Sequence, residues 1–200
     1  MGRATYDDWH RDINEAVGVA AMTGDRVIII GCSTGCTLAT IALAEGKKAH
    51  AMVHVSPNFG LSHAVAQWVL DLPRSEDWTQ ILVGQERSFN VLNEAHAAHW
   101  TLRYPTRAVH TMAETVRKAL AAPIEGITTP ALFCYNRGDK VVSARRTRKA
   151  MARWGAAVED YQFHQTKDDD PMGHIMAGDV FSPGQTEAAV RRILSWLNSL

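Results

Sequence analysis

The chain has 200 residues, about the length of one domain. Hydrophobic residues make up 46% of it and charged residues 21%, as in an ordinary globular domain. Lys and Arg together number 21, and Asp and Glu also number 21, so the formal net charge is zero. This balance excludes a broad electrostatic attraction to nucleic acid or to an anionic membrane surface.

Cysteine content and the lengths of the apolar runs indicate the cellular compartment in which we expect the chain. Three cysteines are too few for a disulfide framework. No apolar run approaches the roughly 18 residues that a membrane span requires. The first ten residues carry no secretory pattern. We therefore expect a cytoplasmic chain with no membrane span and no nucleic-acid partner, and the near-zero charge favours self-association.

The first predicted elements are a helix over residues 5–23 and a strand over 26–30. Thr5 is a suitable helix N-cap, and Asp7 and Asp8 suit the positive end of the helix dipole. The β-branched run 26–30 is continuous, which is typical of a strand buried on both faces. Apolar side chains recur on one face of the helix at Trp9, Ile13, Ala16, Val17, Ala20 and Ala21.

Strands and helices then alternate along most of the chain. The pattern predicts a turn at 31–35, a helix at 37–45, strands at 49–55 and 130–135, a helix at 143–154, a strand at 158–163, and a last helix from Ser182 to about 198. Such alternation implies βαβ units. We therefore predict an α/β fold with a parallel sheet of about four strands and flanking helices.

Residues 57–129 interrupt this alternation, because they exceed what a simple crossover between strands needs. They read as several amphipathic helices with the aromatic residues Trp68, Trp78, Phe89, Trp100 and Tyr104. We predict a core of residues 1–56 and 130–200 and an inserted helical cap over 57–129. The alternative is a set of ordinary packing helices.

The motif with the clearest chemistry is Gly31-Cys32-Ser33-Thr34-Gly35, between the first strand and the second helix. Gly-x-Ser-x-Gly in this context is the nucleophile elbow, in which glycines let neighbouring elements approach a strained serine. The following helix offers backbone N–H groups, that of Thr34 among them, to a developing oxyanion. A nucleotide-binding turn is disfavoured, since the glycine spacing differs and no Gly-Lys-Ser/Thr follows.

A serine nucleophile needs a base, and the base needs an orienting acid. Asp139 directly follows the third predicted strand, where open α/β sheets place their sites. His174 follows the fourth strand and precedes the last helix. Each residue alone would be read as an ordinary loop residue. Together Ser33, Asp139 and His174 follow parallel strands in the order Ser, Asp, His, which predicts a catalytic triad.

The elbow, the Asn-Arg-Gly-Asp-Lys-Val-Val segment and the Gly-His before the last helix resemble the α/β-hydrolase superfamily. The resemblance is to capped carboxylesterases and monoacylglycerol-lipase-like enzymes and covers essentially the whole chain. It implies a serine hydrolase that cleaves carboxylic esters through an acyl-enzyme, with Ser33 as nucleophile, His174 as base and Asp139 as its orienter. The aromatic-rich cap suggests short to medium acyl chains, and no cofactor or metal is expected.

The sequence also departs from that superfamily. Its members carry several strands ahead of the elbow and a loop that donates the second oxyanion-hole N–H, and neither is found ahead of Ser33. The first strand would then form an open sheet edge, and we expect homo-oligomers through this edge or through the helix at 5–23. The alternative function is a non-catalytic α/β-hydrolase-like binding protein, or an inactive fragment.

Other candidate residues have ordinary structural interpretations. We expect the three cysteines to be small buried side chains and the acidic run to be a solvated loop. The histidines near residue 96 lack a zinc-binding pattern. These residues are Cys32, Cys36 and Cys134; Asp168, Asp169 and Asp170; and Glu94, His96 and His99.

Overall fold

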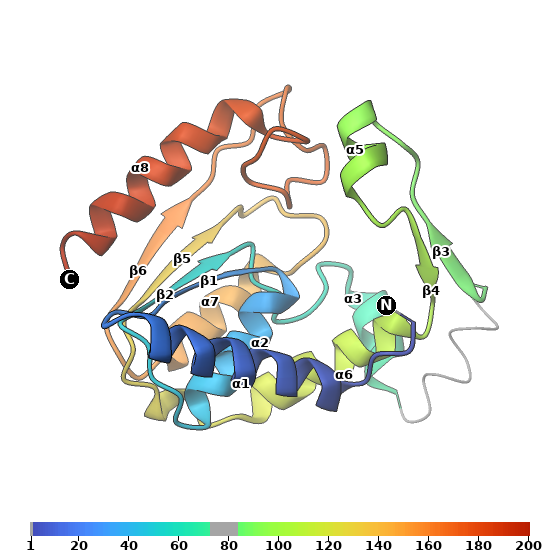
Figure 1. Ribbon diagram of the computed structural model, residues 1–200. Coiled ribbons are helices and arrows are strands. Elements are labelled where there is room, and N and C mark those ends of the chain that lie inside the picture. Colours follow the sequence, from blue (N-terminus) through green and yellow to red (C-terminus); the bar gives the residue numbers. More distant parts are fainter. Residues whose placement is uncertain (1, 73–83) are drawn as a thin grey trace.

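A parallel sheet forms the centre of the computed structural model, which describes residues 2–72 and 84–200 (Figure 1). Its four strands are parallel and lie in the order β1-β2-β5-β6. The strands are β1 (Ile28–Cys32), β2 (Ala51–Val55), β5 (Ala131–Tyr135) and β6 (Val158–Gln162). The predicted α/β class and all four predicted strands are confirmed, with their bounds shifted by one to two residues.

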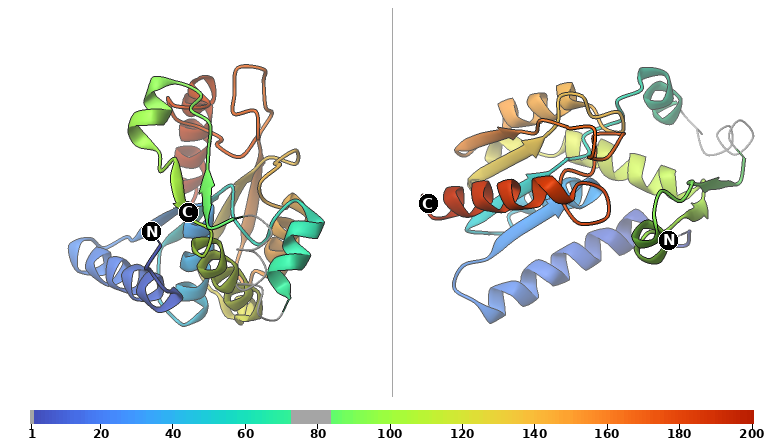
Figure 2. Two further views of the ribbon diagram at one scale, coloured as in Figure 1. Left: turned by 90° about the vertical axis from the view of Figure 1, so that its right-hand side faces the viewer. Right: turned by 90° about the horizontal axis from the view of Figure 1, so that it is seen from above.

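Helices cover both faces of this sheet (Figures 1 and 2). On one side lie α1 (Tyr6–Thr23), α2 (Thr34–Ala44), α6 (Ala108–Ala121) and α7 (Ala144–Arg153). On the other lies α8 (Thr186–Leu197), which follows the single turn η2 (Pro183–Gln185). Thr5 caps α1 through a reciprocal hydrogen-bonded box with Asp8, as its sequence position predicts. None of the helices in the described ranges is long and apolar enough to cross a membrane.

Two apolar clusters hold these layers together. One joins the sheet to α2 and α7 through side chains such as Leu43, Phe133 and Trp154. The other joins the opposite face to α8 through Leu132 and Trp196. Because alternate residues of each strand point to opposite faces, the interior strands β2 and β5 are buried almost throughout, and His54 is the polar exception in β2.

The prediction that the first strand is buried on both faces is wrong. β1 lies at the edge of the sheet and pairs only with β2 among the described strands. Ile28 is 41% exposed and Ile30 is 60% exposed, on the face that α8 covers further along the sheet. A β-branched run therefore marks the strand, but its burial depends on neighbours that the run does not encode.

We expected the segment 57–129 to be helical throughout. It differs from this expectation, because it also contains a short antiparallel hairpin. Its elements are α3 (Ala64–Asp71), β3 (Glu86–Ser88), α5 (Glu94–His99), β4 (Arg103–Pro105), α6 and η1 (Ile124–Gly126). Three-residue strands are too short to show an alternating pattern. Trp78 lies outside the described residues. Figures 1 and 2 show β3, β4 and α5 beyond the carboxyl ends of the central strands.

The end of this segment joins the central layers. Helix α6 packs along α2 and α1, where Tyr6, Ile41 and Ala119 form a small buried cluster. Ile124 and Ile127 are buried in the larger cluster with Phe133. The elements from α3 to β4 are therefore the ones that extend beyond the sheet.

Candidate active site

Ser33 occupies a sharp turn between β1 and α2. Its φ is +49° and its ψ is −116°, a combination that side-chain-bearing residues rarely adopt. Its backbone N–H donates to the Val55 carbonyl at 3.0 Å, and its carbonyl accepts from the Asn58 N–H at 3.1 Å. These bonds to the end of β2 hold the strained turn in place and present the Ser33 hydroxyl at the carboxyl end of the sheet.

The two elbow glycines differ in what requires them. At Gly31, an added Cβ would lie 2.9 Å from the backbone of Cys36, so only glycine lets the strand and helix approach this closely. At Gly35, an added Cβ would meet no heavy atom within 4 Å. The expectation of close packing is confirmed for Gly31 and wrong for Gly35.

Three side chains from three strand ends meet at this turn. The Nε2 atom of His174 lies 3.2 Å from the Ser33 hydroxyl oxygen. Its Nδ1 atom lies 2.8 Å from a carboxylate oxygen of Asp139. The side chains of His174 and Asp139 are 10% and 2% exposed, which keeps water away from their contact. The structure thus brings together the three residues that the sequence singles out.

Asp139 is fixed by its own turn. Its second carboxylate oxygen accepts the backbone N–H groups of Val141 and Val142, at 2.7 and 2.9 Å. These bonds leave the other oxygen directed at His174. A carboxylate held in this way can orient the imidazole and stabilise its protonated form.

The loop that carries His174 is held by Asp170, which sequence reasoning missed. One carboxylate oxygen of Asp170 accepts the N–H groups of His174 and Ile175, at 2.9 and 2.8 Å, and the other accepts from Met172 at 3.0 Å. Asp170 is buried, so the expectation of a solvated acidic run is wrong for this residue. Its position four residues before His174 is the only local signal in the sequence.

Two further contacts fix the same loop. The Ser56 hydroxyl donates to the His174 carbonyl at 2.6 Å. Gly173 has a φ of +65°, and an added Cβ there would lie 2.6 Å from the Asn136 amide nitrogen. The glycine before the histidine is therefore required by both conformation and space.

Thr34 is the first residue of α2, so its backbone N–H has no acceptor within the helix. This group, at the positive end of the helix dipole, suits a developing oxyanion next to Ser33. In the part of the chain that the structure describes, α1 alone precedes β1 in the element order. A loop from a strand ahead of β1, the usual source of a second oxyanion N–H, is thus not among the described residues.

The remaining candidates are placed as follows. Cys36 and Cys134 are buried as expected, but Cys32 is exposed, because it lies on the open edge strand. His96 is buried in α5 between the Trp100 and Phe181 rings. Among the described residues no cluster of His, Cys, Asp and Glu could hold a metal ion.

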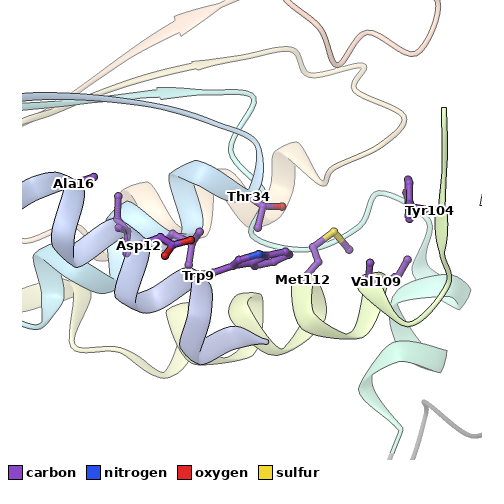
Figure 3. A pocket seen from close by; sticks show the side chains of 10 residues that line it. Trp9, Asp12, Ala16, Thr34, Tyr104, Val109 and Met112 are labelled. Carbon is purple, nitrogen blue, oxygen red and sulfur yellow. The ribbon is translucent and has the colours of Figure 1, made fainter. Parts of the chain in front are cut away.

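A cleft opens beside this site, between α1 and α6 (Figure 3). Its volume is about 580 Å³, within the usual range for small-molecule sites. Thr34 lies in its wall, next to Ser33 in the chain. The sequence predicts an apolar face on α1. Three residues of that face, Trp9, Ile13 and Ala16, form one side of this cleft.

The parallel sheet, the strained serine between strand and helix, and the Ser, Asp, His order at successive strand ends define an α/β hydrolase. A profile of the family described as serine aminopeptidase, S33, matches residues 2–167. The chain therefore belongs to this family of α/β hydrolases.

Solved structures show the same fold at low sequence identity. A metagenome-derived lipolytic enzyme from a study of LipS and LipT superposes with a TM-score of 0.73 at 16% identity, covering 98% of this chain and 75% of that one. A monoacylglycerol lipase of Paleococcus ferrophilus gives 0.65 at 14% identity, covering 99% and 77%. A soluble variant of monoglyceride lipase from Saccharomyces cerevisiae gives 0.66 at 11% identity, covering 99% and 71%. A comparison with curated proteins finds no match.

Proposed function

We propose that the protein is a serine hydrolase that cleaves carboxylic esters. The observation that carries the proposal is the continuous contact from the Ser33 hydroxyl through His174 to the Asp139 carboxylate. A serine hydroxyl is a weak nucleophile until a base removes its proton, and His174 lies within hydrogen-bond reach of that proton. The lipolytic enzymes with the same fold support an ester as the substrate class.

The reaction follows from these positions. Ser33 Oγ attacks the ester carbonyl while its proton passes to His174 Nε2. The Thr34 N–H stabilises the oxyanion, and protonated His174 gives its proton to the leaving alkoxide, which departs as the alcohol. Water activated by His174 then attacks the acyl-enzyme and releases the acid. Asp139 keeps Nδ1 protonated, so that Nε2 is the basic nitrogen throughout.

A second candidate reaction is removal of N-terminal amino acids, as the family description implies for relatives. Asp12 in the cleft wall could pair with a substrate ammonium group. However, its side chain is 67% exposed and lies 3.6 Å from Arg11, so water and a competing cation weaken that pairing. The apolar cleft favours esters. Rates on an aminoacyl p-nitroanilide and on a p-nitrophenyl ester, measured side by side, distinguish the two.

A covalent serine probe tests the proposed nucleophile. A fluorophosphonate should label Ser33 in the native protein, and labelling should become far slower in His174→Ala, because the base is gone while the serine remains. Peptide mapping locates the adduct. A folded sample that takes up no label would favour a non-catalytic binding protein.

We also propose that the protein works in the cytoplasm. Within the segment 57–129, we propose that the elements from α3 to β4 act as a cap over Ser33. The position of β3, β4 and α5 beyond the strand ends supports the cap (Figure 1). Helix α5 is tied to the loop after His174, because the Asn93 amide donates to the Val180 carbonyl at 2.8 Å. The Trp100 and Phe181 rings also meet edge to face, 5.0 Å apart.

We further propose that two copies pair through β1. No described strand pairs with the outer edge of β1, and another strand best satisfies the backbone N–H and C=O groups there. A two-fold axis would place β1 antiparallel to β1 of the second copy. Ile28 and Ile30 would then have β2 as the neighbouring strand on one side and the second copy's β1 on the other. Light scattering should give a dimer for the native chain and a monomer for Ile30→Lys. A monomer at all concentrations for the native chain would contradict this.

A further inference from the structure

The cleft between α1 and α6 is an apolar surface that adjoins the candidate site. Figure 3 shows the Trp9 ring reaching from α1 toward Met112 on α6, with Thr34 beside it. The cleft is open to solvent, so a chain can enter without any element moving. Its lining residues are Trp9, Asp12, Ile13, Ala16, Thr34, Leu38, Tyr104, Ala108, Val109 and Met112.

The chemistry of this lining selects an uncharged, apolar occupant. Aliphatic and aromatic side chains make up most of the wall, and burying apolar groups against them is favourable. Among the lining residues only Asp12 carries a charge, and its side chain is largely exposed. The Asp12 carboxylate at the rim disfavours anionic occupants. A cation would find no second charged partner among the lining residues.

The position of the cleft decides which part of an ester it can hold. The leaving alcohol must receive its proton from His174, so it leaves on the side of the loop that joins β6 to α8. The cleft is lined by residues of α1, α2 and α6. These helices lie on the opposite side of the sheet from α8 (Figure 1). The group that stays bonded to Ser33 is the acyl group, and Thr34 is both the next residue and part of the cleft wall.

We propose that the α1–α6 cleft binds the acyl chain of the substrate and that the preferred substrates carry unbranched, uncharged chains of medium length. The proposal rests on the proposed esterase function. The carbonyl lies at Ser33 and the Thr34 N–H, and the chain extends along Trp9 and Ile13 on α1 against Val109 and Met112 on α6. Each methylene group that enters the cleft is transferred from water to contact with apolar side chains, which favours binding.

A chain-length series tests this directly. For p-nitrophenyl esters from acetate to decanoate, kcat/KM should rise by about fourfold per methylene until the cleft is full. Ala16→Trp adds a large ring to the exposed wall of α1, inside the cleft. It should abolish the rise in kcat/KM for octanoate and decanoate.

The matched control is Ala21→Trp, on the same helix, because Ala21 is exposed and does not line the cleft. It should keep the native chain-length profile. A profile that is flat in the native chain, or equally steep in Ala16→Trp, would overturn the proposal.

A binding measurement separates this proposal from the proposed activity. The methyl ester of dodecanoic acid, brominated at its terminal carbon, quenches indole fluorescence on contact. Added to Ser33→Ala protein, it should quench a component that is lost in Ser33→Ala with Trp9→Phe, since Trp9 lines the cleft. Trp9-dependent quenching without any esterase activity in the native chain would sink the proposed function and keep the cleft as an acyl-binding site. Absence of Trp9-dependent quenching would overturn the cleft proposal.

Discussion

His54 provides a quantitative test of the packing around the site, since this fully buried histidine lies on β2 among aromatic rings. It stacks on Phe133 with centroids 4.1 Å apart and meets the edge of Trp154 at 5.1 Å. Neither ring nitrogen has a hydrogen-bond partner within the described residues. Burial lowers its pKa from 6.5 to about 3, because the charged form would lose its hydration.

The variant His54→Phe keeps the planar ring and removes both unmet nitrogens. It should raise the free energy of unfolding by about 1–3 kcal/mol near neutral pH, the usual cost of a buried unsatisfied polar group. The gain should grow in acid. The pKa of His54 is about 3 in the folded chain and near 6.5 in the unfolded chain. Below pH 6.5 His54 is therefore protonated in the unfolded chain but stays neutral in the folded chain until about pH 3.

This difference costs the native protein about 1.4 kcal/mol per pH unit between pH 6.5 and about 3, and so about 2 kcal/mol at pH 5. Urea unfolding of both proteins at about pH 7.5 and about pH 5 measures it. The gap in unfolding free energy should widen by about 2 kcal/mol at the lower pH. His99→Gln, at an exposed histidine, controls for loss of a surface imidazole. A gap that stays constant between the two pH values would contradict the lowered pKa of His54 in the folded protein.

The remaining predictions concern the loop residues around His174. Asp139→Asn should leave the fold intact and lower kcat by about 10⁴-fold, because the amide favours the wrong tautomer of His174; a loss of less than tenfold would contradict its assigned role. Asp170→Asn removes a carboxylate that accepts three backbone N–H bonds. It should lower kcat by about 10²-fold with KM little changed, since it displaces His174 without touching the cleft. The exposed Asp168→Asn is its control, and an equal loss there would refute this.

Much of the core was predictable because its signals are local. Mainly apolar runs mark β1, β2 and β5, and Gly31 and Ser33 mark the elbow by spacing alone. Asp139 and His174 could be chosen because parallel strands bring their carboxyl ends to one edge. Contact of these two side chains with each other and with Ser33 was thus expected from chain order.

The errors arise where burial depends on partners distant in sequence. The continuous apolar run predicts a strand buried on both faces, but Ile28 and Ile30 are exposed on the face that α8 covers only further along the sheet. Asp170 looks like a solvated acid, but the turn that ends at His174 aims three N–H groups at it. The hairpin of β3 and β4 carries too few residues for a pattern to show. None of these features has a periodic signature in the sequence.

We propose that Ser33 is the nucleophile of a working esterase. The most direct test of this proposal is hydrolysis of p-nitrophenyl butyrate by the native chain beside Ser33→Ala, with circular dichroism showing that both samples are folded. If Ser33 is the nucleophile, turnover should be measurable in the native chain and fall by about 10⁴–10⁶-fold in the variant, which also guards against a contaminating esterase. Equal rates in the two folded samples, or no turnover above the uncatalysed reaction, would contradict it.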